Sequence, residues 1–130
     1  MPASTDDTLK QILEEMSHLP DFVGIPLNSP DAKGNFGNTP LHVAAVRGDT
    51  RSGRTLLRAG ANPNVRGEHG YTPLHEAVEQ ENADFVKLLL GYGVQLSVAN
   101  EDGETAGDIA RKTGNVAISK ILERAQSQSQ

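Results

Sequence analysis

The sequence repeats itself at an interval of 33 residues, and this period restricts the fold more than any other feature. Gly37, Gly70 and Gly103 are spaced by this interval, and each is followed two residues later by a threonine. The tripeptide Pro-Leu-His at residues 40–42 returns at residues 73–75. Periods of this length are typical of solenoids, in which each repeat packs only against its neighbours.

Each repeat has the features of two short helices joined by turns. Thr39 and Thr72 are natural N-caps, because a threonine oxygen can accept a hydrogen bond from a helix N–H group. The proline that follows each of them has its φ angle preset for a helix. Gly60 and Gly93 stand where the second helix of a repeat should end. The pattern predicts helices at residues 5–18, 40–47, 50–59, 73–80, 83–92, 106–113 and 116–125.

These motifs resemble the ankyrin-repeat signature. The resemblance is carried by Thr-Pro-Leu-His-Val-Ala-Ala at residues 39–45, by Thr-Pro-Leu-His-Glu-Ala-Val at residues 72–78, by Gly-Ala-Asn-Pro-Asn at residues 60–64 and by the period itself. It covers about residues 33–123. It implies an all-α solenoid of helix–turn–helix units stacked in parallel, with hairpin-like turns projecting sideways.

The ends of the chain are expected to cap this solenoid. Leu9, Ile12, Leu13 and Met16 form the apolar side of an amphipathic helix, which Ser4 or Thr5 would cap. Residues 28–31 align with residues 61–64 at the 33-residue offset. We therefore expect a single domain, with a capping helix and divergent repeat at residues 4–33, repeats at 34–66 and 67–99, a C-terminal capping repeat at 100–125 and a frayed tail at 126–130.

Two departures from the repeat pattern carry structural expectations. Gly53 lies inside the second helix of the first full repeat, which is expected to pack less well, because glycine is unfavourable in a helix interior. The third repeat has Ala106, Gly107 and Asp108 in place of Pro-Leu-His and so lacks a buried leucine. Its second helix is rich in charged residues, as the exposed end of a solenoid requires.

Composition excludes several classes of function. There are 12 basic residues against 17 acidic ones, a net charge of −5, and no basic run, so neither nucleic acid nor an anionic membrane is an expected partner. The absence of cysteine excludes disulfides and thiolate chemistry. The N-terminal residues lack the pattern of a signal peptide, and no apolar run is long enough to span a membrane. We expect a cytoplasmic protein.

No arrangement of side chains points to catalysis or to a metal site. His42 and His75 occupy equivalent positions in adjacent repeats, too far apart to share one metal ion. Each imidazole is expected to bond backbone or hydroxyl groups and to tie neighbouring turns together. The acidic side chains of the helices, Asp49, Glu76, Glu79 and Glu81, are interpreted as a solvated face. No catalytic residue, cofactor or metal ligand is predicted.

The resemblance implies a concave binding face, formed by the turn tips and the exposed side of each first helix. Phe36 and Tyr71 are aromatic residues expected to project from this face, where aromatic side chains favour interface hot spots. Acidic residues at the tips of the second and third repeats would steer a basic partner. The predicted partner-binding residues are Asn35, Phe36, Asn38, Arg47, Arg66, Glu68, His69, Tyr71, Glu79, Gln80, Glu101, Asp102, Glu104 and Lys112.

The sequence therefore predicts a non-catalytic, monomeric protein–protein interaction module with a partner that is basic at the contact. The chain also resembles small stand-alone bacterial ankyrin proteins, some of which look like immunity or antitoxin partners. An immunity protein that neutralises a basic, nuclease-type toxin is the alternative. A hydrolase or metal enzyme is a distant alternative, because the sequence lacks a recognisable set of catalytic or metal-binding residues.

Overall fold

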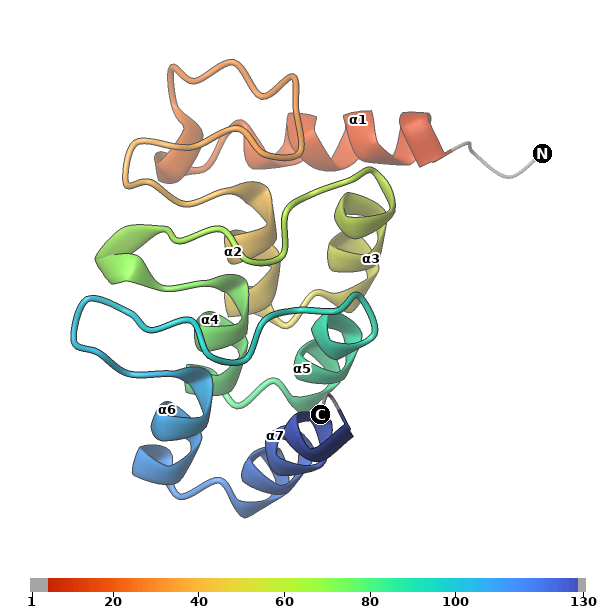
Figure 1. Cartoon of the computed structure of the whole chain (residues 1–130). Helices are drawn as coiled ribbons and strands as arrows, with labels where there is room; N and C mark the ends of the chain where they lie inside the picture. Colours follow the sequence, from red (N-terminus) through yellow and green to blue (C-terminus); the bar gives the residue numbers. More distant parts are fainter. Residues whose placement is uncertain (1–4, 129–130) are drawn as a thin grey trace.

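The helices are arranged in two parallel rows. The structure, a computed structural model, describes residues 5–128. The inner row consists of α2 (Pro40–Arg47), α4 (Pro73–Glu79) and α6 (Ala106–Thr113), and the outer row of α1 (Thr5–Met16), α3 (Thr50–Arg58), α5 (Ala83–Leu90) and α7 (Val116–Gln128) (Figure 1). Two short 3-10 turns, η1 (Pro20–Phe22) and η2 (Glu68–Gly70), complete the order. Residues 5–128 contain no strand, and the all-α solenoid is confirmed.

A hairpin turn precedes each helix of the inner row. Backbone hydrogen bonds close the first hairpin between the N–H of Gly34 and the carbonyl of Asn38, at 2.8 Å, and the second between Gly67 and Tyr71, at 2.7 Å. The third hairpin, residues 100–104, is closed in the same way at 2.9 Å. Figure 1 shows the three hairpins projecting to the same side of the inner row. The repeat therefore brings residues 33 apart in sequence into neighbouring places on one face.

The threonine caps form as the sequence predicts. At the start of α4, the Thr72 hydroxyl accepts a hydrogen bond from the N–H of His75 at 3.3 Å. The Nδ1 atom of His75 accepts one from the N–H of Thr72 at 3.0 Å. Two N–H groups that the first turn would leave unpaired are thus satisfied reciprocally.

The same histidines connect each repeat to the next. Because Nδ1 of His42 accepts the N–H of Thr39, the ring hydrogen lies on Nε2, which donates to the carbonyl of Tyr71 at 2.8 Å. His75 makes the equivalent bond to the carbonyl of Glu104, also at 2.8 Å. The prediction that these imidazoles tie neighbouring turns together is confirmed. Burial lowers the pKa of His42 from 6.5 to about 4, so that its ring is neutral.

In the third repeat an aspartate replaces the histidine. The N–H of Thr105 donates to Oδ2 of Asp108 at 2.9 Å, and the N–H of Asp108 donates to the Thr105 hydroxyl at 3.2 Å. The cap is therefore kept, whereas the side chain is too short to reach a further hairpin. This replacement suits the last unit, since no hairpin follows α6 and α7 within the described residues.

The hydrophobic core lies between the two rows of helices. Leu74 and Phe85 lie at its centre and are 1% and 0% exposed. Ile12, Leu13 and Met16 of α1 are buried, which confirms the amphipathic N-terminal helix. That helix packs on α3, so it covers the end of the outer row.

Gly53 allows α3 to pack closely against α5, so the expectation that its helix packs less well is wrong. The residue is buried, and a Cβ atom built on it would lie 2.6 Å from the ring of Phe85 on α5. Only glycine lets this large ring lie against the helix. Leu56 and Leu57 of the same helix are buried as well.

Five helix ends differ from the prediction, two of them, at Arg58 of α3 and Glu79 of α4, by a single residue. The first helix ends at Met16 and not at residue 18, and α5 ends at Leu90 and not at residue 92. In the other direction, α7 continues to Gln128, three residues past the predicted end, because residues 126–128 contain no glycine or proline to stop it. The proposed cap at Ser4 and the end of the tail lie outside the described residues.

The segments that follow the outer helices stack on one another. The N–H of Asn62 donates to Oδ1 of Asp31 at 2.9 Å, and the N–H of Gln95 donates to Oδ1 of Asn64 at 2.7 Å. Both bonds join residues 31 apart, and Asp31 and Asn64 differ by one repeat length. The alignment of residues 28–31 with residues 61–64 is thereby confirmed.

Candidate protein-binding surface

A groove of about 480 Å³ lies where the first two hairpins meet the inner row of helices. It gathers residues from η1, the first hairpin, α2, η2 and α4. Its lining residues are Leu19, Pro20, Asp21, Phe36, Asn38, Val43, Val46, Arg47, Glu68 and Glu76. Four of the predicted binding residues, namely Phe36, Asn38, Arg47 and Glu68, come together here.

Apolar side chains line one part of the groove. Phe36 is 53% exposed and Val46 is 43% exposed, while Val43 is partly buried and packs against the core. The prediction that Phe36 projects from the surface is confirmed. An exposed aromatic ring next to an exposed valine is an apolar patch that a partner can cover.

Glu76 gives the groove its electrostatic character. Burial, followed by the charges of Glu79, Glu68 and Asp21, raises the pKa of its carboxyl group from 4.5 to about 7. The ion pairs found among residues 5–128 do not include it, so no cation of the described chain neutralises it. The interpretation of Glu76 as part of a solvated face is therefore wrong.

Asp49, which was interpreted in the same way, is also structural. It caps α3, because its Oδ1 atom accepts a hydrogen bond from the N–H of Ser52 at 3.1 Å. Glu79 and Glu81 are exposed, as the sequence predicts for a solvated face.

Tyr71 does not project outward as predicted. Its ring is half-buried, packs against the core and lies with its centroid 5.3 Å from that of His75. Burial, followed by the charge of Glu79 and a hydrogen bond to it, raises the pKa of the Tyr71 hydroxyl to about 12, so the hydroxyl stays protonated. Truncating Tyr71 would disturb the fold as well as the surface.

Three other predicted residues hold the hairpins in shape. The side-chain amide of Asn35 donates to the carbonyls of Val23, at 3.0 Å, and Pro20, at 3.3 Å. Oδ1 of Asn38 accepts the N–H of Glu68 at 3.0 Å, which joins the first hairpin to the second. Nε of Arg66 donates to the carbonyl of Gly70 at 3.4 Å, within its own hairpin.

The remaining predicted residues lie outside the groove. Glu104 and Lys112 form an ion pair at 3.4 Å between the third hairpin and α6. His69 lies at the tip of the second hairpin, with its side chain 76% exposed and a positive φ of 58°. The other four, Glu79, Gln80, Glu101 and Asp102, are exposed.

The sequence prediction of the binding surface omitted Asp21, Val43 and Glu76, which line the groove. Glu76 could have been singled out from the sequence. The equivalent positions in the other two repeats, Val43 and Ile109, are apolar. A charge at that position only in the central repeat marks it as unusual. Asp21 carried no signal, since it belongs to a segment without periodicity.

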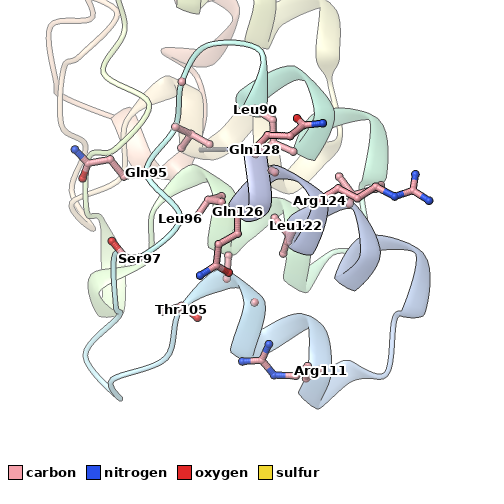
Figure 2. Close-up of a pocket in the computed structure, with 16 residues that line it drawn as sticks. Leu90, Gln95, Leu96, Ser97, Thr105, Arg111, Leu122, Arg124, Gln126 and Gln128 are labelled. Carbon is pink, nitrogen blue, oxygen red and sulfur yellow. The ribbon is translucent and has the colours of Figure 1, made fainter. Parts of the chain in front are cut away.

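A second hollow, of about 980 Å³, lies at the C-terminal end of the solenoid. Figure 2 shows it between the segment at residues 93–97, the start of α6 and the last turns of α7. Its labelled lining residues are Leu90, Gln95, Leu96, Ser97, Thr105, Arg111, Leu122, Arg124, Gln126 and Gln128. The sequence analysis did not predict this site.

Neither a metal-binding cluster nor a membrane span was found between residues 5 and 128. In this part of the chain no three side chains of the metal-binding types lie close enough to hold one ion. No helix there is both long and apolar enough to cross a bilayer.

Comparison with known proteins agrees with the geometry. A family model described as ankyrin repeats, in three copies, matches residues 3–100 and again residues 53–128. No curated protein matches the sequence. Ankyrin repeats are generally protein–protein interaction modules, and proteins of the family are typically non-catalytic. Since the two matches together extend over nearly the whole chain, the protein belongs to the ankyrin-repeat family.

Proposed function

We propose that this protein binds a partner protein that is basic at the contact, and that the groove between the first two hairpins receives it. The observation that carries the proposal is Glu76, a half-buried carboxyl group without a neutralising cation among the described residues, in the same groove as the exposed ring of Phe36. A partially desolvated acid beside an apolar patch is suited to a lysine or arginine side chain.

The two parts of the groove match the two parts of such a side chain. The aliphatic stem of a lysine or arginine can cover Val46 and Phe36, and its charged end can approach Glu76. A cation over the face of the Phe36 ring gains a further attraction. Because Asp21 and Glu68 line the same groove against one arginine, Arg47, an acidic group would be repelled there.

The third hairpin extends this surface. Glu101 and Asp102 are exposed at its tip and add to the negative field without lining the groove. Such outlying charges accelerate the association of a basic partner more than they strengthen the complex. In this proposal the protein acts as a monomer, without catalysis, cofactor or metal, and binds neither nucleic acid nor membrane.

A basic toxin of the nuclease type is one partner that this surface would fit. The supporting observation is the acidic groove, since an enzyme that acts on phosphate backbones carries a basic active-site face. In that case the protein would act as an immunity or antitoxin protein in the cytoplasm. Inhibition of such a nuclease by the wild-type protein, and not by a Glu76→Lys variant, tests this version.

The general proposal is tested by comparing which proteins the wild type and two variants retain from the same cell extract. The wild-type protein, a Glu76→Lys variant and an Asp84→Lys variant are immobilised and exposed to the same extract of cells that express the protein. Asp84 is exposed on α5, in the outer row, so its reversal is a matched control for charge. A partner of the groove is retained by the wild type and the control and lost from the Glu76→Lys variant.

The captured protein is then purified and its affinity measured by calorimetry. The Glu76→Lys change should raise the Kd at least about tenfold, which corresponds to about 1.4 kcal/mol, while Asp84→Lys should leave it nearly unchanged. Equal binding by all three folded proteins would show that partners use another surface.

A further inference from the structure

The hollow at the C-terminal end occupies a place that is filled in the other repeats. In the first two full repeats, the segment after the outer helix turns back and stacks on the preceding segment, as the bonds from Asn62 to Asp31 and from Gln95 to Asn64 show. The third repeat does not do this within the described residues, because α7 continues as a helix to Gln128. No segment of residues 5–128 therefore stacks on residues 95–97.

A missing side chain enlarges the same space. Gly107 occupies the position of Leu41 and Leu74, which are 0% and 1% exposed. A Cβ atom built on Gly107 would have its nearest neighbours at 3.6 Å, on Arg111, and at 3.7 Å, on Thr105, so a side chain has room there. The hollow of about 980 Å³ therefore lies where the other repeats have a leucine and a returning segment.

The walls of the hollow suit an extended peptide. Leu96, Ile121 and Leu122 supply apolar surface, and Leu96 and Ile121 are partly exposed at the edge of the core. Ser97 stands one repeat length after Asn64, whose side-chain oxygen accepts a backbone N–H from the next segment. The Ser97 hydroxyl has no hydrogen bond to any described residue and can accept one from an incoming backbone.

The charge of this site differs from that of the rest of the protein. The chain has a net charge of −5, whereas the residues that line the hollow include Arg111 and Arg124 and no acid. Arg111 is paired with Asp108, while the ion pairs within residues 5–128 do not include Arg124. An occupant with an acidic group near Arg124 is therefore favoured over a basic one.

We propose that this hollow binds an extended segment of a partner protein that completes the solenoid. The segment places an aliphatic side chain over Gly107, donates a backbone N–H to Ser97 and carries an acidic residue near Arg124. It lies one repeat length beyond residues 94–97, in the equivalent place at the end of the solenoid. This second site is separate from the acidic groove and does not depend on the function proposed for that groove.

The test uses a synthetic peptide as the probe. Its sequence copies residues 93–99, Gly-Val-Gln-Leu-Ser-Val-Ala, and ends in an added aspartate; a matched peptide ends in lysine. Binding of the fluorescein-labelled peptides to the full chain is followed by anisotropy. The aspartate peptide should bind saturably with a Kd below about 1 mM, and the lysine peptide several-fold more weakly.

Two substitutions at one position separate filling of the hollow from helix propensity. The Gly107→Leu change restores the leucine of the other repeats and should weaken peptide binding at least about tenfold without lowering the melting temperature. The Gly107→Ala change improves the helix but leaves most of the space open, so it should alter the Kd less than about threefold.

A measurement on the unsubstituted protein keeps the proposal testable if the leucine variant fails to fold. On addition of the aspartate peptide, the methyl resonances of Leu96, Ile121 and Leu122 should shift, and that of Val46 in the acidic groove should not. The proposal is overturned if the peptide shows no saturable binding, if Gly107→Leu binds it as tightly as the wild type, or if the shifts map to the groove.

Discussion

At the scale of single residues, burial moves two proton equilibria in opposite directions. It raises the pKa of Glu76 and lowers that of His42, so in both cases the neutral form is favoured. The histidine could be assigned from the sequence, because its partners lie at fixed places in the repeat. The pKa shift of the glutamate could not, although its charge stands out in the repeat pattern, since its burial and its charged neighbours depend on how η1 and the hairpins fold against α4.

A Glu76→Gln substitution should stabilise the protein at high pH. The folded-state pKa of about 7 lies above the ordinary 4.5, so the folded state holds the proton more tightly than the unfolded state. Stability is therefore greatest below pH 4.5 with respect to this group and is lost as the pH rises to about 7. At pH 8 the amide should add about 1 kcal/mol, less than the full shift because the carboxyl group remains partly solvated.

Urea denaturation at pH 5 and pH 8 measures this effect. The gain from Glu76→Gln should be larger at pH 8 than at pH 5, because the wild-type carboxyl group is mostly protonated at the lower pH. The Glu81→Gln change, at an exposed acid outside the groove, is measured beside it as the control. A gain that is the same at both values would contradict the assigned ionisation.

A His42→Ala substitution should lower the free energy of unfolding by about 2–4 kcal/mol. It leaves the N–H of Thr39 and the carbonyl of Tyr71 without their partner inside the stack. In the wild type, the depressed pKa means that stability from this group is present above pH 6.5 and is lost as the pH falls to about 4. Denaturation of His42→Ala and of the exposed control His18→Ala at pH 7.5 should separate the two, with little loss in the control.

At the scale of helices, features that form within one turn could be predicted from the sequence, whereas features that depend on contacts between repeats could not. The starts of α2, α4 and α6 were predicted from the sequence, because threonine caps act within a single turn. The role of Gly53 was not, because it depends on the ring of Phe85, which lies in the next repeat. Helix propensity alone therefore gave the wrong sign for that position.

The Gly53→Ala and Gly107→Ala substitutions should have opposite effects. A methyl group at residue 53 meets the Phe85 ring at 2.6 Å and should destabilise the protein by about 1–3 kcal/mol, as overpacking does. At residue 107 the nearest atom is 3.6 Å away, so alanine should stabilise by about 0.5–1 kcal/mol through helix propensity. Thermal melts of the two variants would contradict this account if both moved in the same direction.

At the scale of the whole molecule, stability passes from repeat to repeat through shared interfaces. The stacking of the three repeats could be predicted from the period, whereas the groove could not, because residues 19–36 contribute to it without any repeat pattern. The family resemblance pointed to hairpin and inner-helix residues, some of which line the groove. It could not show that Tyr71 is partly buried while Phe36 remains exposed.

A Leu74→Ala substitution should be among the most damaging changes. Leu74 is 1% exposed and belongs to α4, which packs on both α2 and α6. Removing a buried leucine side chain costs about 2–5 kcal/mol, a large fraction of the stability of a small domain. A loss below about 1 kcal/mol in urea denaturation would be incompatible with this position in the core.

The last prediction concerns how the acidic surface recruits its partner. Phe36 lines the groove and should act after contact, whereas Glu101 lies at the exposed tip of the third hairpin and should act before it. With the captured basic partner, Phe36→Ala should raise the dissociation rate at least about tenfold and leave the association rate nearly unchanged. Glu101→Lys should instead slow association by a few-fold and flatten its dependence on salt. Stopped-flow binding at about 50 and 500 mM salt resolves both rates, and thermal melts of the free variants check that each remains folded. If Glu101→Lys changed only dissociation, the third hairpin would be part of the contact itself, and if Phe36→Ala changed neither rate, the partner would bind elsewhere.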